Sequence, residues 1–519
     1  MNWERSVIGI EFGSTRIKAV LMDEDHLPVA SGSYDWENQL VDGIWTYSMD
    51  EIHKGMHACY ADLARDVKEK FGEDLKKVGA LGISGMMHGY LPFDKDGNLL
   101  VPFRTWRNTI TGEAAAKLTE LFGFNIPQRW SIALLYQAIL NKEPHVDKIA
   151  YLTTLAGYIH WKLTGEKVMG IGEASGMFPI DSDIMDFNQE MLDKFDEVSG
   201  QPWKIRDILP KVLVAGDDAG VLTEEGVRFL DPTGTLEPGI PLAPCEGDAG
   251  TGMAATNSVR VRTGNVSAGT SDFAMVVTDH ALGVHRELDM VTTPSGMPVA
   301  MVHCNNCTSD LNAWGNLLRE FAGLVGVELN LGQVLTLMFQ KSLEADEDCG
   351  GLLSYNYFSG EGVTDIDEGR PVFLRKPDAE LSFANFGRAH VMSALSTLKV
   401  GLDILINEEK VTVDKLYGHG GFFKTPVAGQ KMLSAACNVP VSVMKTAGEG
   451  GPYGMALLCA YLIGHDEGET LEDYLDNKVF ASAESSTVMA EPELVSSFEK
   501  YLSAYVKAFP VERKAVELF

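Results

Sequence analysis

The stretch "IGIEFGSTRIKAV", Ile8 to Val20, decides the fold that this sequence predicts. Its pattern predicts two β-strands, Val7 to Phe12 and Ile17 to Met22, joined by the turn "GSTR", in which Gly13 can adopt a left-handed conformation. A glycine turn with hydroxyl residues lets backbone N–H groups approach an anion closely. The hairpin is therefore either an ordinary turn or a cradle for a phosphate group.

A second stretch, "VRVRTGNVSAGTSDFAMVV" at Val261 to Val277, repeats this pattern. Aligned on Gly13 and Gly269, both copies continue with two small hydroxyl residues and an apolar strand. The repeat indicates a duplicated chain with one hairpin in each half. Two such hairpins could hold a polyphosphate from opposite sides.

The rest of the chain alternates predicted helices and strands. Apolar residues recur at steps of three and four from Ile52 to Phe71, as in a helix, and the apolar run Val78 to Ser84 follows as a buried strand. In "LYGHGGFFKTPVAGQKML" a Gly-Gly turn at Gly420 precedes a helix, with Thr425 as its expected N-cap and Pro426 as its first residue. This alternation predicts the α/β class.

The length of 519 residues exceeds what one hydrophobic core usually supports, so two large domains are expected. The segment Leu230 to Gly252 is rich in proline and glycine and precedes the second hairpin. We therefore predict an N-terminal domain over residues 1–257, a C-terminal domain over 258–465 and an acidic helical appendage over 466–519.

The net charge of −30 repels phosphate backbones and anionic lipid headgroups. Neither nucleic acid nor a membrane is an expected partner. The chain has no run of 18 apolar residues and no secretory signal at its start, which favours a cytoplasmic location.

The seven cysteines are scattered, which favours reduced thiols. "HCNNC", His303 to Cys307, has the spacing of metal ligands, but no second pair matches it. Buried thiols are therefore expected.

Asp248 lies in "CEGDAGTG", among small residues that would let a substrate approach. It is either an aspartate in a surface turn or the carboxylate that accepts a hydroxyl proton during phosphoryl transfer.

Seven motifs in this order resemble a known family. They are "IGIEFGSTRIKAV", "LGISGMMHG", "FRTW", "GDAGTGMAA", "VSAGTSDFAMVV", "GHGGFFKTPVAGQKML" and "GGPYGMALLCAYL". Together they resemble the FGGY carbohydrate kinases, and most of all the xylulokinase branch, from about Val7 to Leu462.

The resemblance implies two actin-like ATPase (ribonuclease H-like) domains with an interdomain cleft that closes to exclude water. It implies an ATP-dependent sugar kinase that transfers the γ-phosphate to a primary hydroxyl of a ketose, with Mg²⁺ as cofactor and a ketopentose as the expected acceptor. A small-molecule sugar and ATP are then the partners, and a homodimer is expected.

The resemblance also implies roles for single residues. Asp248 matches the proton acceptor, and Met87 and His88 of "MMHG" match a segment that contacts the sugar. Trp106 is expected to line the sugar pocket, although His88 and Trp106 could instead be core residues. The residues implied to bind ATP are Gly13, Ser14, Thr15, Gly269, Thr270, Ser271, Gly420, Gly421, Gln430 and Ser434. Gly450 to Tyr461 resembles the second connector between the domains.

Two departures from the family pattern matter. Glu11 stands where the family usually has an aspartate that organises magnesium, so Glu11 and Asp248 are the candidate metal residues. The sugar-side segment usually reads Trp-Asn-Asp followed by an arginine, but here it reads Trp106, Arg107, Asn108. Losing two polar anchors argues against D-xylulose itself and leaves a hexulose, a deoxysugar or a polyol as alternatives. An alternative class is an activating ATPase, with Cys304 or Cys307 at an iron–sulfur cluster.

Overall fold

The computed structural model describes residues 1–444 and 450–519. The chain forms two compact units. Unit 1 comprises Met1–Val259, Asp289–Val299 and Glu449–Ser482, and unit 2 comprises Arg260–Leu288, Ala300–Gly448 and Ala483–Phe519. The three-part division into residues 1–257, 258–465 and 466–519 stays a prediction.

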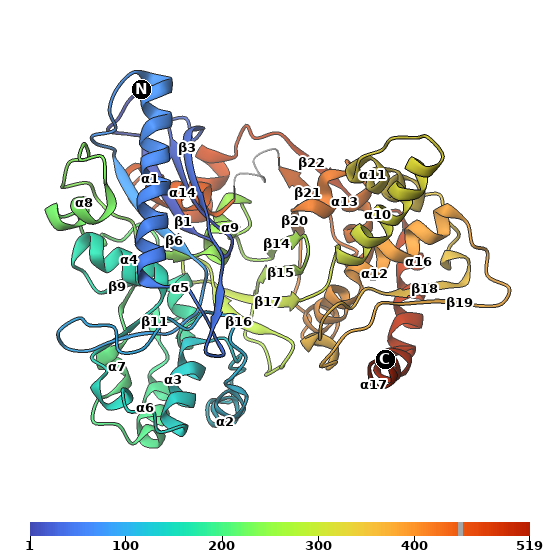
Figure 1. Cartoon of the computed structure of the whole chain (residues 1–519), viewed down its shortest axis with the longest axis horizontal. Coiled ribbons are helices and arrows are strands. Elements are labelled where there is room, and N and C mark those ends of the chain that lie inside the picture. The colour runs from blue at the N-terminus through green and yellow to red at the C-terminus, as the bar shows by residue number, and fades with distance from the viewer. Residues whose placement is uncertain (445–449) are drawn as a thin grey trace. The chain divides into compact units, whose positions relative to one another are not determined.

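A five-stranded sheet in the order β13-β6-β1-β2-β3 organises unit 1. Its strands are β1 (Val7–Phe12), β2 (Arg16–Met22), β3 (Pro28–Asp35), β6 (Ala80–Gly85) and β13 (Glu246–Gly247). Figure 1 labels three of these strands, β1, β3 and β6. β1, β2 and β3 are antiparallel neighbours, whereas β6 is parallel to both β1 and β13. The predicted first hairpin and the strand after the first helix are therefore confirmed.

Helices α1 (Met49–Phe71) and α14 (Gly451–Gly464) cover opposite faces of this sheet. Gly9 pairs with Val20 and Gly32 with Ala19, so the two glycines point to opposite faces because successive strand residues alternate. A Cβ atom on Gly9 would lie 2.1 Å from the carbonyl oxygen of Pro452 in α14, and one on Gly32 would lie 2.3 Å from that of Cys59 in α1. Both helices thus pack directly on strand backbone.

Unit 1 contains many further elements outside this sheet. They are β4 (Gln39–Val41), β5 (Ile44–Thr46), β7 (Leu91–Phe93), α2 (Gly112–Phe122), α3 (Ser131–Leu140), η1 (Val146–Lys148), β8 (Tyr151–Thr153), α4 (Leu155–Thr164), β9 (Val168–Gly170), α5 (Ile171–Ser175), β10 (Ile180–Asp181), β11 (Asp186–Phe187), α6 (Gln189–Ser199), α7 (Ile205–Ile208), β12 (Lys211–Leu213), α8 (Glu224–Leu230), α9 (Asp248–Ala255), β16 (Asp289–Thr292), α15 (Leu471–Tyr474) and η7 (Leu475–Val479).

Unit 2 repeats the arrangement around a second sheet, in which β17, β15, β14, β20, β21 and β22 are successive neighbours. These strands are β14 (Thr263–Ala268), β15 (Asp272–Val277), β17 (Pro298–Cys304), β20 (Lys415–His419), β21 (Val441–Met444) and β22 (Ser485–Val488). β14 and β15 form the predicted antiparallel hairpin, and β20 lies parallel to β14 just as β6 lies parallel to β1. Both sheets therefore have the same arrangement of an antiparallel hairpin and a parallel neighbouring strand, as the duplication predicted from the two hairpins requires.

The other elements of unit 2 are mainly helical. They are α10 (Ser309–Leu324), α11 (Leu331–Ser342), η2 (Cys349–Gly351), β18 (Leu352–Tyr355), η3 (Gly362–Thr364), β19 (Val372–Arg375), α12 (Phe383–Asp403), η4 (Ile404–Glu408), η5 (Gly421–Lys424), α13 (Ala428–Cys437), α16 (Pro492–Lys507) and α17 (Phe509–Leu518). Among the described residues one helix, Phe383–Glu408, is long and apolar enough to cross a bilayer by length and composition alone, and most of it is buried inside the protein.

Two local predictions were wrong. The helix after the Gly-Gly turn does not begin at Thr425 and Pro426: residues Gly421–Lys424 form a 3-10 turn, and α13 begins at Ala428. The acidic tail is not wholly helical, because β22 extends the second sheet by pairing antiparallel with β21. Its sequence, "SSTV", is too short and polar to stand out as a strand.

Candidate functional site

The carboxyl ends of three parallel strands meet at one edge of the first sheet. Glu11 of β1 and Glu246 of β13 both align with Ser84 of β6. The residues that follow these strands therefore emerge together, and they include Met87 and Asp248. In open α/β sheets this edge is the usual place for a ligand.

Asp248 is the first residue of α9 and follows β13 directly. Its Oδ1 accepts a hydrogen bond from the backbone N–H of Met87 over 3.3 Å. Burial raises the pKa of Asp248 to about 6. The carboxylate is thus oriented by the loop after β6 and has a pKa suited to exchange a proton near neutral pH.

Glu11 lies close to Asp248, at the end of β1. Burial, together with the charge of Asp248, raises the pKa of Glu11 to about 7, while its cross-strand neighbour Lys18 acts in the opposite direction. A Cβ atom on Gly451, the first residue of α14, would lie 2.0 Å from Oε1 of Glu11, so only glycine leaves room for this carboxylate.

The donor set of Glu11 and Asp248 fits a divalent cation. Two neighbouring carboxylates raise each other's proton affinity, and a cation between them would remove that repulsion. In residues 1–444 and 450–519 no group of three acidic, histidine or cysteine side chains is arranged to hold a metal. Mg²⁺ usually takes one or two carboxylates and completes its shell with phosphate oxygens and water.

Two further buried acids lie behind Asp248, and the sequence analysis missed both. Glu246 accepts hydrogen bonds from the N–H groups of Gly172 and Glu173, at 3.2 and 2.9 Å, and burial raises its pKa to about 8. Both carboxyl oxygens of Glu173 are buried without a hydrogen-bond partner among the described residues. Burial raises the pKa of Glu173 well above its ordinary value, and the charges of Asp248 and Glu246 add to this effect. The sequence did offer one signal for Glu173 and Glu246: each is an acidic residue among apolar and small neighbours.

The carbonyl groups of the first hairpin turn accept hydrogen bonds that fix the position of the turn. Trp36 donates from Nε1 to the carbonyl oxygen of Gly13 over 2.7 Å and from its backbone N–H to that of Thr15 over 3.2 Å, and the Tyr47 hydroxyl donates to that of Ser14. The backbone N–H groups of Ser14 and Thr15 make no hydrogen bond to any described residue. A turn with its carbonyls tied and its amides unused can accept an anion.

The predicted sugar residues lie near this turn and near Asp248. The indole of Trp106 is half-buried and donates to Oγ of Ser14 over 3.3 Å. Asn108 is buried. Its Oδ1 accepts a hydrogen bond from the N–H of Trp45 and its Nδ2 donates one to the carbonyl oxygen of Trp45, each over 2.9 Å. Met87 is buried and contacts Asp248 through its N–H. His88, the next residue, is also buried and has a left-handed backbone with a φ of 68°.

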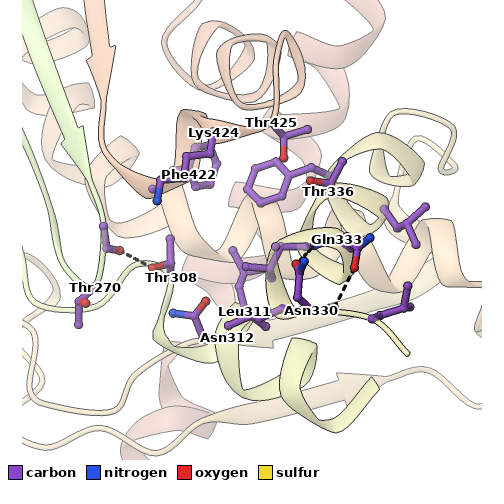
Figure 2. A pocket seen from close by; sticks show the side chains of 18 residues that line it. Thr270, Thr308, Leu311, Asn312, Asn330, Gln333, Thr336, Phe422, Lys424 and Thr425 are labelled. Atoms are coloured by element: carbon purple, nitrogen blue, oxygen red, sulfur yellow. Dashed lines mark hydrogen bonds between the residues drawn. The ribbon is translucent and has the colours of Figure 1, made fainter. Parts of the chain in front are cut away.

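A cavity of about 890 Å³ opens in unit 2 (Figure 2). The turn between β14 and β15 contributes Gly269 and Thr270, and the 3-10 turn after β20 contributes Gly421. Other lining residues are mainly leucines and hydroxyl or amide side chains: Leu311, Leu329, Leu331, Leu335, Leu337, Thr308, Asn312, Gln333, Thr336 and Thr425. The cavity thus combines a polar turn with a leucine-rich wall, and most of its lining was missed because α10 and α11 carry no recognisable motif.

Thr308 clamps the second hairpin at the mouth of this cavity. It donates to the carbonyl oxygen of Gly269 from both its N–H, over 2.9 Å, and its hydroxyl, over 2.6 Å (Figure 2). The N–H of Cys307 donates to the carbonyl of Thr270 over 3.0 Å. As in the first hairpin, the carbonyl oxygens of the turn accept hydrogen bonds from other residues of the protein.

Of the seven residues of unit 2 predicted to bind ATP, four do not line this cavity: Ser271, Gly420, Gln430 and Ser434. Gln430 donates from Nε2 to the carbonyls of Val441 and Ser486, and Ser434 donates to the carbonyl of Val439 over 2.6 Å. Both side chains are buried. Neither side chain lines the cavity beside the hairpin turn of unit 2, and their roles remain predictions.

The cysteines are free and buried, including Cys304 and Cys307. Burial raises the pKa of both thiols well above the ordinary value, and the charge of Asp272 adds to it. These are the properties of inert core thiols.

The chain is similar to known carbohydrate kinases. The sequence model of the FGGY family of carbohydrate kinases, N-terminal domain, matches residues 6–254, and that of its C-terminal domain matches residues 264–463. A xylulose kinase of Haemophilus influenzae is 22% identical over 89% of this chain and 94% of its own length. A glycerol kinase of Thermococcus gammatolerans is 23% identical over 53% of this chain and 54% of its own length. The crystal structure of a xylulose kinase from Lactobacillus acidophilus superposes with a TM-score of 0.78 at 18% identity, over 98% of each chain. The predicted fold class, two actin-like domains, is confirmed.

Proposed function

The chain belongs to the FGGY family of carbohydrate kinases, and from this premise we propose that it transfers the γ-phosphate of ATP to a primary hydroxyl of a ketose. The family assignment favours a carbohydrate kinase over an activating ATPase. Kinases of this family use ATP. The open points are which residues catalyse phosphoryl transfer and which sugar accepts the phosphate.

The observation that carries the proposal is the setting of Asp248. Its carboxylate is oriented by the N–H of Met87 and has a pKa raised to about 6 by burial. Such a group is ionised at neutral pH yet basic enough to take the proton from an attacking hydroxyl. Asp248 would accept this proton as the acceptor oxygen approaches the γ-phosphorus.

Glu11 and Asp248 would hold Mg²⁺ on the phosphate side. When bound, the ion neutralises charge on the phosphate oxygens. Glu11 has the longer side chain, and the absence of a Cβ atom on Gly451 gives its carboxylate the space it needs.

The cavity in unit 2 is the proposed nucleotide site. Its volume of about 890 Å³ is in the range of cofactor pockets, about 300–1,000 Å³. The leucine-rich wall suits a purine ring, and the N–H groups of the turn at Gly269 and Thr270 suit phosphate oxygens. The turn Gly13 to Thr15 of unit 1 has the same kind of unused amides, and we propose that it too binds phosphate oxygens.

The acceptor is proposed to be a ketopentose, in line with the similarity to xylulose kinases. A polyol is the second candidate, because a glycerol kinase is also among the relatives. A hexulose or a deoxysugar remains open as well. We further propose that the enzyme works in the cytoplasm and as a homodimer.

An ADP-release assay over ketopentoses, ketohexoses, deoxyketoses and polyols tests the proposal, with ATP and Mg²⁺ in every reaction and no acceptor as the blank. One acceptor should raise ADP release well above the blank, and mass spectrometry should find a phosphate monoester of it. ADP release that never exceeds the blank would contradict the proposed function.

A further inference from the structure

The hairpin turn at Gly269 and Thr270 depends on the segment that connects β17 to α10. This segment, residues 305–308, contains Cys307 and Thr308, which donate to the two carbonyl groups of the turn. The N–H of Thr270 makes no hydrogen bond to any described residue and stays available for a phosphate oxygen. The position of this amide is therefore set by residues 305–308.

A buried acid, Glu361, holds this segment in turn. Glu361 is 1% exposed. Its Oε2 accepts hydrogen bonds from the N–H of Asn305 over 2.9 Å, from the N–H of Asn306 over 3.3 Å and from Nδ2 of Asn306 over 3.0 Å. Burial raises the pKa of Glu361 to about 7. Because these contacts converge on Oε2, a proton on Oε1 leaves them in place, so the side chain can hold the segment in either protonation state.

Two buried asparagines complete the connection. Oδ1 of Asn306 accepts a hydrogen bond from the N–H of Phe358 over 2.8 Å. Nδ2 of Asn356 donates to the carbonyl oxygen of Cys307 over 3.0 Å. Both asparagines are 2% exposed. Hydrogen bonds thus run without a break from the segment after β18, through residues 305–308, to the hairpin turn.

Glu361 and Asn306 act from outside the cavity. Neither residue lines it, so any effect of theirs on ATP has to pass through residues 305–308. A turn that is already held in its binding conformation need not be ordered when the ligand binds, and this raises the affinity. The buried contacts of Glu361 and Asn306 can supply that order.

We propose that Glu361 and Asn306 are positioning residues for the nucleotide, which fix residues 305–308 and thereby hold the amide of Thr270 in place for the phosphate oxygens of ATP. This inference rests on the proposed function, because it takes the cavity in unit 2 as the nucleotide site. It assigns a part in ATP binding to two residues that lie outside the hairpin motifs and touch no nucleotide.

Calorimetric titration of the non-hydrolysable analogue AMP-PNP with Mg²⁺, into the full-length protein, tests the inference. Glu361→Ala should raise the dissociation constant of AMP-PNP by about 5- to 30-fold, which is the cost of ordering the backbone of one turn residue on binding. The acceptor KM at saturating ATP should stay close to that of the wild type. Glu361→Gln keeps an oxygen for the converging donors and should recover most of the affinity.

Asn306→Ala should act like Glu361→Ala, and Asn385→Ala is its matched control. Asn385 is also a buried asparagine of unit 2 that holds backbone groups. Its Oδ1 accepts from the N–H of Asp346 over 2.8 Å and its Nδ2 donates to the carbonyl oxygen of Glu380 over 3.0 Å. Both asparagine variants should lower the melting temperature, but only Asn306→Ala should weaken AMP-PNP binding.

Thr308→Val tests the last link without disturbing the buried side chains of Glu361 and Asn306. It loses the hydroxyl that donates to Gly269 but keeps the N–H, so the dissociation constant of AMP-PNP should rise by about 2- to 10-fold. If the alanine variants do not fold, this variant decides, and wild-type affinity in it would overturn the inference.

The outcomes separate the inference from the proposed function. Wild-type affinity for AMP-PNP in folded Glu361→Ala and Asn306→Ala would overturn the inference and leave the proposed function standing. Weakened AMP-PNP binding in these variants, together with a wild type that phosphorylates no acceptor, would overturn the proposed function and leave the inference standing. A wild type that binds no AMP-PNP would overturn the nucleotide site and the inference with it.

Discussion

The backbone N–H of Met87 donates to Oδ1 of Asp248 over 3.3 Å, across 161 positions of sequence. This contact joins the loop after β6 to the first residue of α9. It orients the carboxylate of Asp248. His88, the residue after Met87, accepts a hydrogen bond from Nε of Arg129. The carboxylate of Asp248 is thus linked to Arg129 through two consecutive residues, Met87 and His88.

Replacing Glu11 by alanine should weaken Mg²⁺-dependent turnover much more than acceptor binding. The change removes one of the two carboxylates proposed to hold the ion, and even the loss of a residue that only supports a metal ligand typically costs about 10- to 100-fold in affinity. Titrating Mg²⁺ in the kinase assay gives the apparent Mg²⁺ constant, and calorimetry without Mg²⁺ gives acceptor affinity. Glu11→Asp, which restores the residue usual in the family, should recover most of the activity. Equal Mg²⁺ constants for wild type and Glu11→Ala would remove Glu11 from the metal site.

Replacing Glu173 by glutamine should change how stability depends on pH. Because burial raises the pKa of Glu173, the folded protein binds more protons than the unfolded chain between the ordinary and the raised value. Stability from this group is therefore lost as pH rises through that window. Thermal unfolding at pH 5, 6.5 and 8 should show Glu173→Gln gaining stability over wild type with rising pH. Glu347→Gln, at an exposed pair with Lys500, is the control. A constant difference between wild type and Glu173→Gln would show that Glu173 is not protonated in the folded state.

Two adjacent glycines in the turn after β20 should respond differently to alanine. Gly421 lines the cavity and a Cβ atom there meets nothing within 4 Å, so Gly421→Ala should fold normally but raise the KM for ATP. Gly420 has a φ of 98°, and a Cβ atom there would lie 2.4 Å from the carbonyl oxygen of Ala268. Gly420→Ala should therefore lower the melting temperature. Nucleotide titration and thermal unfolding of both variants check this, and a lowered melting temperature in Gly421→Ala with an unchanged ATP constant would contradict it.

Replacing Ser434 by alanine should cost stability rather than nucleotide affinity. Its hydroxyl donates to the carbonyl of Val439 and accepts from the N–H of Ala490 over 2.9 Å, so the variant leaves two buried backbone groups unpaired. A loss of about 1–3 kcal/mol is expected from urea unfolding. A normal unfolding curve with a weakened ATP constant would instead restore Ser434 to the nucleotide site.

The hairpins could be predicted from the sequence because their signals are local. Alternation, a glycine turn and two hydroxyl residues lie within about a dozen positions, and the same set recurs in the second half. The start of α13 could not be predicted this way. Thr425 and Pro426 look like a helix start, but the chain turns through Gly421–Lys424 first, and Val427 adopts a φ of 70° before the helix begins.

The candidate site was predictable only in part, for a related reason. Asp248, Met87 and Glu11 lie in motifs, and parallel strands carry them to one edge of the sheet. Arg129 and Asp289 lie 160 positions apart in segments without a motif, and only the folded chain brings them together. Glu173 and Glu246 likewise acquire their raised pKa values from burial, which no short stretch of sequence reveals.

Phosphoryl transfer by Asp248→Asn is the measurement that tests the central claim most directly. Asparagine keeps the size of the side chain and an oxygen for the N–H of Met87, but it cannot accept the hydroxyl proton. With the best acceptor, sugar phosphorylation should fall by at least about 100-fold, in line with the loss of a general base, while the dissociation constant for ATP stays close to that of the wild type. Near-normal turnover of Asp248→Asn would show that another group accepts the proton.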